Sequence, residues 1–134
     1  MYKISALVIL CVSIPTILCM SDEMQELLDM LHNTCREQSG AAEDVIRAVS
    51  KGVFADDQNL KCYAKCIMTE MSTISDDGVV DVEATVALLP EDVRSKFEPT
   101  VRKCGSPAGA DACDTALKAF KCYYENDPAD FFFP

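Results

Sequence analysis

The sequence has little positive charge, because 12 Lys and Arg face 22 Asp and Glu, giving a formal net charge of −10 at pH 7. A chain with this balance is repelled by nucleic acid and by anionic membrane surfaces. No basic patch with interleaved aromatic residues interrupts the acidic excess, so nucleic-acid binding is excluded as a function. The charge also speaks against a membrane-active helical protein, a class that favours basic amphipathic faces.

Histidine is scarcer still, since His32 is the only one in the chain. Zinc sites commonly combine histidines with closely spaced cysteine pairs, and no two cysteines here are separated by two residues, so no metal site is expected. No nucleophile motif accompanies His32, and a lipase-like histidine and aspartate pair is not visible. We therefore expect no catalytic residue, no cofactor and no enzyme activity. His32 is interpreted as a solvent-facing or hydrogen-bonded helix residue, with pH sensing as the alternative.

Long apolar segments are almost absent. The one apolar run, residues 6–19, follows Lys3, is interrupted by Pro15, and stops abruptly at an acidic segment. It falls short of the roughly 20 apolar residues that a membrane-spanning helix needs. A short positive start followed by such a run is typical of a secretory signal peptide.

We expect this signal peptide to comprise residues 1–21, with cleavage between Cys19 and Asp22. Residues 22–134 then form a single domain with a net charge of −11, because Lys3 is the only charged residue that is removed. The mature protein is expected to be extracellular and not membrane-embedded.

Cysteine is plentiful in what remains. Two of the eight cysteines, Cys11 and Cys19, lie in the expected signal peptide. An even number in a secreted chain favours three disulfides, for which 15 pairings exist. Crosslinks worth about 2–4 kcal/mol each suggest either a hollow interior or exposure to protease-rich fluid. The six remaining cysteines are Cys35, Cys62, Cys66, Cys104, Cys113 and Cys122.

No segment alternates as a β-strand does, and no repeat is visible. Apolar residues instead recur at steps of three and four, which predicts an all-α fold of six helices. The central helix is expected to start at Asp56 or Asp57 and the last at Asp111 or Asp114, while Pro99 kinks or shortens the fifth. The first helix is expected to stop before Gly40. The helical patterns cover residues 22–35, 42–51, 57–71, 82–89, 91–104 and 111–125.

The central helix organises the chain. Cys62 and Cys66 lie one turn apart on the same face, with Cα atoms too distant and side chains too parallel for an unstrained bond between them. Each must pair with a cysteine elsewhere, so this helix holds two other segments in place.

The cysteines are separated by 26, 3, 37, 8 and 8 residues. These intervals, with the sequence Leu-Lys-Cys-Tyr-Ala-Lys-Cys-Ile-Met over residues 60–68, resemble the insect odorant-binding and pheromone-binding proteins. The resemblance implies a compact, disulfide-linked box of six helices around an apolar cavity. It also implies the pairs Cys35–Cys66, Cys62–Cys113 and Cys104–Cys122.

The same resemblance implies a secreted carrier that reversibly binds small hydrophobic odorants or pheromones and delivers them through sensillar lymph to olfactory receptors. A carrier or scavenger of such molecules outside olfaction is the alternative. The sequence leaves open whether the protein forms a homodimer. Ligand-binding candidates come from the apolar helix stripes and the tail: Met68, Val82, Val86, Leu89, Phe97, Phe120, Tyr123, Phe131, Phe132 and Phe133.

Polar groups such as Tyr63, Tyr123 or Tyr124 are expected to orient a ligand hydroxyl or carbonyl. The three consecutive phenylalanines at the end of the sequence are costly to leave in water, so they must fold back or bind something. We hypothesise that this tail is a pH-sensitive lid. Asp127, Asp130 and the terminal carboxylate would be held by hydrogen bonds or by Lys and Arg side chains and released when they protonate, with His32 as a secondary candidate sensor.

Overall fold

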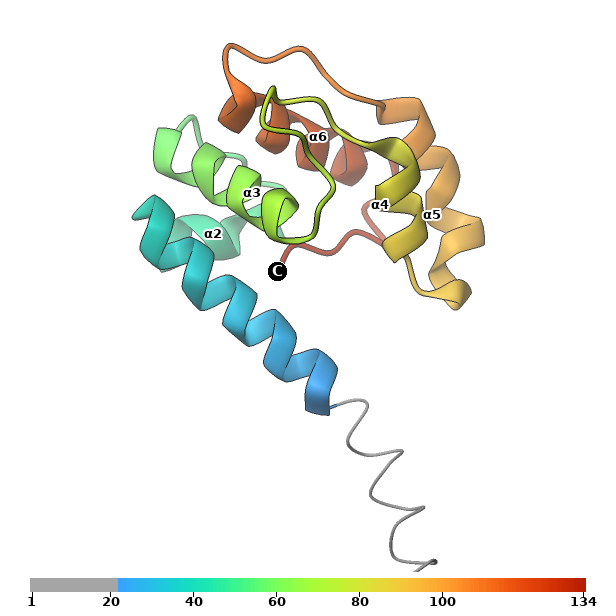
Figure 1. Ribbon diagram of the computed structural model, residues 1–134, viewed down its shortest axis with the longest axis horizontal. Helices are drawn as coiled ribbons and strands as arrows, with labels where there is room; N and C mark the ends of the chain where they lie inside the picture. The colour runs from blue at the N-terminus through green and yellow to red at the C-terminus, as the bar shows by residue number, and fades with distance from the viewer. Residues whose placement is uncertain (1–21) are drawn as a thin grey trace, which may run out of the picture.

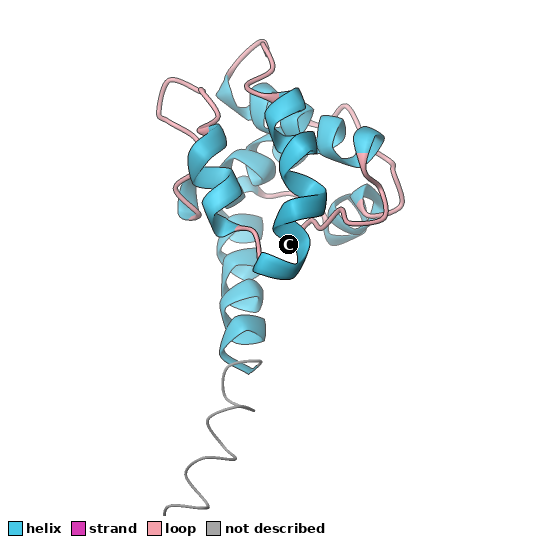
Figure 2. Cartoon of the chain, turned by 90° about the vertical axis from the view of Figure 1, so that its right-hand side faces the viewer, coloured by secondary structure: helices cyan, strands magenta, loops and turns pink. Residues whose placement is uncertain are grey.

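Helices account for all the regular structure in residues 22–134, the part of the chain that the computed structural model describes (Figure 1). Figure 2 shows helices joined by loops throughout this part, and the closest approach to a sheet is one isolated antiparallel bridge between Ile74 and Val80. The all-α prediction is confirmed, whereas the expected signal peptide, with Cys11 and Cys19, lies outside the described residues. The helices comprise residues 22–39, α2 (Glu43–Val49), α3 (Gln58–Glu70), α4 (Val82–Leu88), α5 (Glu91–Cys104) and α6 (Ala112–Asn126).

Aspartate caps fix where three of these helices begin. The Asp57 carboxylate accepts hydrogen bonds from the backbone N–H groups of Asn59 and Leu60 at 2.8 and 3.1 Å. Asp81 caps α4 and Asp111 caps α6 in the same way. Such caps satisfy N–H groups that the helix itself cannot pair and contribute about 0.5–2 kcal/mol each. The choice left open at two helix starts is thus settled for Asp57 and Asp111.

Two helices end where the sequence leads one to expect. The first continues from residue 22 to residue 39 and ends before Gly40, whose φ of +72° suits a glycine after a helix. Helix α5 passes through Pro99 without stopping. Proline removes one backbone hydrogen bond there, but its side chain is exposed, and the turns on both sides are fixed by the buried Phe97 and Val101.

The centre of the molecule is the pair α3 and α6, which pack along each other, while α4 and α5 stand together at one end (Figure 1). Leu60, Tyr63 and Ile67 on α3 and Ala116 on α6 are completely buried. The small Ala116 and Ala119 side chains let the two helix backbones approach closely. This contact buries the apolar stripes that the sequence shows on both helices.

Three disulfides join Cys35 to Cys66, Cys62 to Cys113 and Cys104 to Cys122. These are the pairs that the family resemblance implies. Because Cys62 and Cys66 both belong to α3, this helix is bonded to the first helix on one side and to α6 on the other. The third bridge ties the end of α5 to α6.

The two ends of the described chain differ in how they meet this centre. The first helix projects from the body in Figure 1, and its early side chains Met24 and Leu27 are each 58% exposed. The last residues instead return beneath α3 and α6, toward the side where the first helix lies. No helix in residues 22–134 is long and apolar enough to cross a membrane.

Candidate ligand-binding site

A groove with a volume of about 490 Å³ lies between the first helix, α2 and the C-terminal tail. Its apolar lining comes from Leu28, Ile46, Phe132 and Phe133. The rim is polar, because Gln25, Asp29, His32, Glu43, Arg47 and Ser50 also line it. An open groove with this mixture of groups suits the entrance to a site for an apolar ligand better than its final position.

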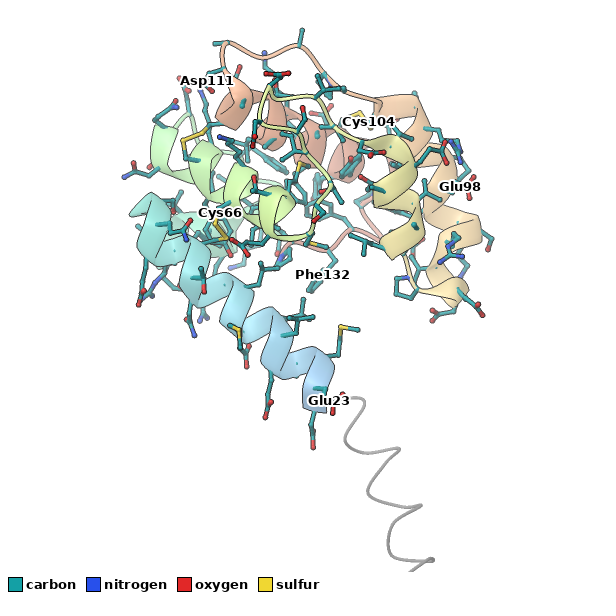
Figure 3. The ribbon with its side chains drawn as sticks, in the orientation of Figure 1. Glu23, Cys66, Glu98, Cys104, Asp111 and Phe132 are labelled. Atoms are coloured by element: carbon teal, nitrogen blue, oxygen red, sulfur yellow. A yellow bond between two sulfur atoms is a disulfide. The ribbon has the colours of Figure 1, made fainter. Side chains whose placement is uncertain are left out.

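The tail forms one wall of the groove with alternating side chains. Residues after α6 have no helical structure, and in an extended chain neighbouring side chains point to opposite sides. Phe133 is accordingly buried, with its ring 4.8 Å from that of Phe120 and 5.6 Å from that of Tyr63. Phe132 is 60% exposed and projects from the body on the side of the first helix (Figure 3).

Phe131, like Phe133, turns toward the protein. It is half-buried and packs edge-on against Tyr124 with ring centres 5.4 Å apart, and its ring also meets Phe54 and Phe120. Two of the three phenylalanines therefore fold back onto the helices, as the cost of exposing them leads one to expect.

A chain of polar contacts fastens the end of the tail. The buried Tyr63 hydroxyl donates to the backbone oxygen of Pro134 at 2.6 Å and lies 2.8 Å from Nδ1 of His32. On its other side, His32 places Nε2 2.9 Å from the carboxylate of Glu43. The tail is thereby connected through α3 and the first helix to α2.

The electrostatics of this chain of contacts are set by Glu43 and by burial. Hydrogen bonds from His32, then from Arg47 and Arg36, lower the Glu43 pKa to about 2. Burial and the nearby Glu43 charge raise the pKa of Tyr63 above its ordinary value. Glu43 is thus ionised and Tyr63 is a neutral donor at every physiological pH.

Within residues 22–134, the acidic residues of the tail are held by hydrogen bonds rather than by ion pairs. Among the described residues neither Asp127 nor Asp130 forms an ion pair, and the Asp127 carboxylate accepts a hydrogen bond from the Asp130 backbone at 3.3 Å. Ring packing and the hydrogen bond from Tyr63 to Pro134 attach the tail, and release by protonation of its acids stays a hypothesis. His32 adjoins this attachment through its contact with the Tyr63 hydroxyl.

Nine of the ten predicted ligand-binding residues belong to the hydrophobic core cluster of the described residues, which extends from the first helix and α2 to α6 and the tail. Six are buried in it, and Val82, Leu89 and Phe131 pack against it from the sides. Phe132 is the exception and lies in the groove. Phe133 of the tail and Ile46 of α2 belong to both the groove and the cluster, so the tail forms part of the boundary between them. The six buried members are Met68, Val86, Phe97, Phe120, Tyr123 and Phe133.

Two polar atoms near this cluster are buried without a hydrogen-bond partner among the described residues, the hydroxyl of Tyr123 and Nε of Arg94. Arg94 uses Nη2 to donate to the carbonyl oxygens of Ala87 and Leu89 at the end of α4. Tyr123 is 4% exposed, and burial raises its pKa to about 12. Buried polar groups without partners are uncommon in folded proteins, so each requires an explanation.

Residues 19–126 match the PBP/GOBP family. The chain belongs to this family. The match covers most of the chain and includes all six paired cysteines, but it ends before the tail, so the tail's arrangement rests on the structure itself.

Similar proteins include general odorant-binding protein 69a of Drosophila melanogaster, 33% identical over 94 residues, which are 69% of this chain and 64% of that protein. The match thus spans just under two thirds of that relative. Among solved structures, Apis mellifera odorant binding protein 5 has a TM-score of 0.77 and 25% identity, covering 84% of this chain and 96% of that one. A fatty acid binding protein, OBP56a, from the oral disk of the blowfly Phormia regina has a TM-score of 0.61 and 26% identity, covering 77% and 90%.

Within this PBP/GOBP fold, most of the groove was not predicted from the sequence. The position of Ile46 beside the tail and the roles of Glu43, Arg47 and Ser50 were not foreseen. The four-residue spacing of Glu43 and Arg47 does signal an ion pair on one helix, which the structure contains at 2.9 Å. The contact of Glu43 with His32 joins two separate helices, and no local pattern predicts it.

Proposed function

We propose that this PBP/GOBP protein is a carrier that binds one small hydrophobic molecule in the apolar cluster between α3, α4, α5 and α6, with the tail as a movable wall. The observation that carries the proposal is the position of Phe133, which packs on Phe120 inside the cluster and also borders the open groove. A molecule entering from the groove reaches the interior once this ring moves aside.

The side chains of the groove and of the apolar cluster support entry through the groove and binding in the cluster. The groove has charged groups on its rim, whereas the cluster offers aliphatic and aromatic walls. Transfer of apolar surface from water into such walls contributes about 25 cal/mol per Å². A hydrophobic ligand therefore gains more in the cluster, and the groove serves as its entrance. Binding of this kind requires no catalytic residue and no cofactor, and we propose that the protein is not an enzyme.

A matched pair of neighbouring rings tests the role of the tail. Phe133→Ala removes the buried ring, and Phe132→Ala makes the same change on the exposed side one residue earlier. If the ligand lies behind the tail, Phe133→Ala should weaken binding of a long-chain alcohol about tenfold, whereas Phe132→Ala should change it less than twofold. Isothermal titration calorimetry on both variants measures this difference.

Truncation after Asp127 is the stronger form of the test. It removes both inward-facing rings and the Tyr63 contact, so affinity should fall at least as far as in Phe133→Ala, with faster ligand dissociation. A truncated protein that binds and releases ligand like the intact one would show that the tail is not a wall of the site. A larger loss in Phe132→Ala than in Phe133→Ala would place the ligand in the groove.

For the biological setting, we propose secretion after cleavage between Cys19 and Asp22 and delivery of odorants or pheromones through sensillar lymph to olfactory receptors. The similarity to odorant-binding proteins supports this setting. N-terminal sequencing of the secreted protein checks the cleavage site. Light scattering with and without ligand measures whether the carrier is a monomer or a homodimer.

Transport outside olfaction is the second candidate, and the similarity to a fatty acid binding protein of an oral disk favours it. Localisation of the transcript separates the two settings. Expression confined to olfactory sensilla supports odorant delivery, and expression in mouthparts, haemolymph-producing tissue or glands supports the other carrier role.

A further inference from the structure

The proposed carrier function does not use two features of the protein surface. The first is the early part of the first helix, residues 22–31, which projects from the body (Figure 1). Its side chains Met24, Leu27 and Met30 are 58%, 58% and 65% exposed, and residues three apart lie on one side of a helix. A helical segment of this length is barely stable in water unless its apolar side packs against another surface. This apolar stripe therefore calls for a surface that covers it.

The charge of the same segment restricts what can cover the stripe. Residues 22–31 contain four acidic residues and no basic one. Glu23 lies one turn before Leu27 and Glu26 directly precedes it, so carboxylates border the stripe, and Figure 3 shows Glu23 at the far end of the helix. Pairing two such helices would bring like charges together. A complementary surface is apolar and bordered by positively charged groups.

The second feature is a cleft of about 180 Å³, the lysine cleft, formed by α3, α6 and the segment before α3. Three lysines and two aspartates in its lining leave a local charge of +1, although the chain as a whole is strongly acidic. Sites that enclose a small molecule usually measure roughly 300 Å³ or more, so this cleft suits a side chain of a protein partner better. The apolar lining is Phe54, Ala55 and Leu117, and the charged lining is Asp56, Lys61, Asp114, Lys118 and Lys121.

Two lysines of this cleft can accept a further carboxylate. An ammonium group has three donor hydrogens. Lys118 contacts the Asp114 carboxylate at 3.3 Å and donates to the Ala108 carbonyl oxygen at 3.2 Å. Within residues 22–134, Lys121 approaches one carboxylate, that of Glu125 at 4.0 Å, and both side chains are more than half exposed. Such an exposed pair contributes little, so an incoming carboxylate displaces water rather than a firm partner.

We propose that the first helix of one copy of this protein docks into the lysine cleft of another copy. Leu27 fills the apolar part of the cleft, while Glu23 and Glu26 meet the lysines. The two surfaces of one chain do not reach each other, because the projecting end of the first helix points away from α6 (Figure 1). The contact joins two different surfaces, so copies add head to tail, unlike the halves of a two-fold dimer.

The negative charge of both copies opposes their approach at long range but not the contact itself. At physiological ionic strength, charges farther apart than about 8 Å are largely screened, whereas groups in contact are not. One half of a helix in a small cleft buries less than the roughly 1,200 Å² of stable interfaces. The association is therefore weak, reversible and dependent on protein concentration.

Two charge-reversed variants test this docking by sedimentation equilibrium at protein concentrations up to about 1 mM, which detects weak association. The helix variant carries Glu23→Lys and Glu26→Lys, and the cleft variant carries Lys118→Glu and Lys121→Glu. The wild-type mass should rise with concentration, and each variant alone should stay monomeric because it lacks one of the two surfaces. An equimolar mixture should form a dimer and nothing larger, since the intact helix of one variant docks into the intact cleft of the other.

Further variants separate this contact from general effects of charge and folding. Asp76→Lys with Asp77→Lys changes the net charge as much as the helix variant does, but in an exposed turn, and should associate at least as strongly as the wild type. Leu27→Ser keeps the charge, removes the apolar anchor and should weaken association about tenfold. Combining all four reversals in one chain should restore association. Circular dichroism checks that each variant is folded.

Three outcomes would overturn the proposal. Wild-type protein that stays monomeric at the highest concentration, or a mixture of the helix and cleft variants that stays monomeric, would refute the docking. A cleft variant that associates like the wild type, beside a monomeric helix variant, would indicate contact between two first helices instead. The proposal does not depend on the carrier function, which the ligand-binding measurements on Phe132 and Phe133 test separately.

Discussion

Helices α3 and α6 and the C-terminal tail all place apolar side chains in the interior. Different interactions hold the helix pair and the tail in position. The two helices share the Cys62–Cys113 disulfide and residues such as Tyr63 and Ala116 that have no exposed surface. The tail has two inward-facing rings and one hydrogen bond to Tyr63. The difference separates a part of the molecule that maintains the fold from a part that can open for a ligand.

Removal of the Cys62–Cys113 disulfide should have the largest effect and should act on stability alone. The two cysteines are 51 residues apart, and closing a loop of that length stabilises the folded state by about 4 kcal/mol in the chain-entropy description. The double variant Cys62→Ser, Cys113→Ser should lose about that much free energy of unfolding in urea. The ligand affinity of the molecules that remain folded should stay within twofold.

A matched comparison is Cys104→Ser with Cys122→Ser, where the separation is 18 residues. The shorter loop predicts a loss about 1 kcal/mol smaller. If the Cys62–Cys113 variant instead loses ligand affinity while keeping its stability, the centre is part of the binding mechanism and the distinction between the two regions fails.

Phe120→Ala tests the boundary between the regions, because this ring belongs to α6 and contacts Phe133 of the tail. The tail can follow into the space left, so the loss of stability should be about 2–3 kcal/mol, below the 3–5 kcal/mol usual for a phenylalanine in a solid core. The enlarged interior should favour bulkier ligands. Chemical denaturation and competitive binding of branched against linear alcohols measure the two effects.

Leu60→Ala is the control for that experiment, since Leu60 has no exposed surface on the central helix. It should cost stability in the usual range of about 2–5 kcal/mol and leave the order of ligand preference unchanged. Equal changes of preference in both variants would mean that Phe120 is ordinary core.

Glu43→Gln should have a smaller effect, which is confined to the free energy of unfolding and to its dependence on acidic pH. The folded-state pKa of about 2 lies below the ordinary value of 4.5, so the carboxylate stabilises the fold above pH 4.5 and loses this contribution as the pH falls from 4.5 toward 2. The variant should be about 1 kcal/mol less stable at pH 7, allowing for solvent screening. Its stability should depend less on pH between 4.5 and 2, as urea titrations at several pH values would show. Glu37→Gln changes an exposed residue on the first helix and should alter neither the stability at pH 7 nor its pH dependence.

His32→Gln should have the smallest effect, on the pH dependence of the tail. Tyr63 has one hydroxyl hydrogen and two neighbours, Nδ1 of His32 and the Pro134 oxygen. A neutral His32 that directs its hydrogen to Glu43 leaves Nδ1 as a competing acceptor. A protonated His32 donates on both sides and frees the Tyr63 hydrogen for Pro134. Acidification should therefore tighten the tail and slow ligand dissociation a few-fold, the reverse of release by carboxylate protonation.

In His32→Gln this slowing should disappear, while Arg36→Gln, which changes another partner of Glu43, should retain it. Stopped-flow measurement of ligand dissociation at about pH 7 and about pH 5.5 provides the comparison. Faster dissociation at the lower pH in the wild type would contradict the hydrogen-bond assignment.

Local sequence rules predicted the helices and the aspartates that cap their starts. Both signals are short-range, because apolar residues recur every three or four positions and the capping aspartate directly precedes them. They could not predict the groove, which depends on where the first helix lies relative to the tail. The alternation of Phe131, Phe132 and Phe133 becomes visible only once the tail is known to be extended. Phe120 and Tyr123 were found because both lie on an amphipathic face, but the unpaired hydroxyl of Tyr123 depends on what α4 places opposite it.

The disulfides also divide the helices by how far each can move. The first helix, α3, α5 and α6 each contain at least one bridged cysteine, and together they form a single covalently closed frame. The two seven-residue helices, α2 and α4, contain none. Helix α2 borders the groove and α4 borders the apolar cluster, so two of the elements around the proposed site are free of the frame. Amide hydrogen exchange should accordingly change on ligand binding in α2 and α4 before it changes anywhere in the frame.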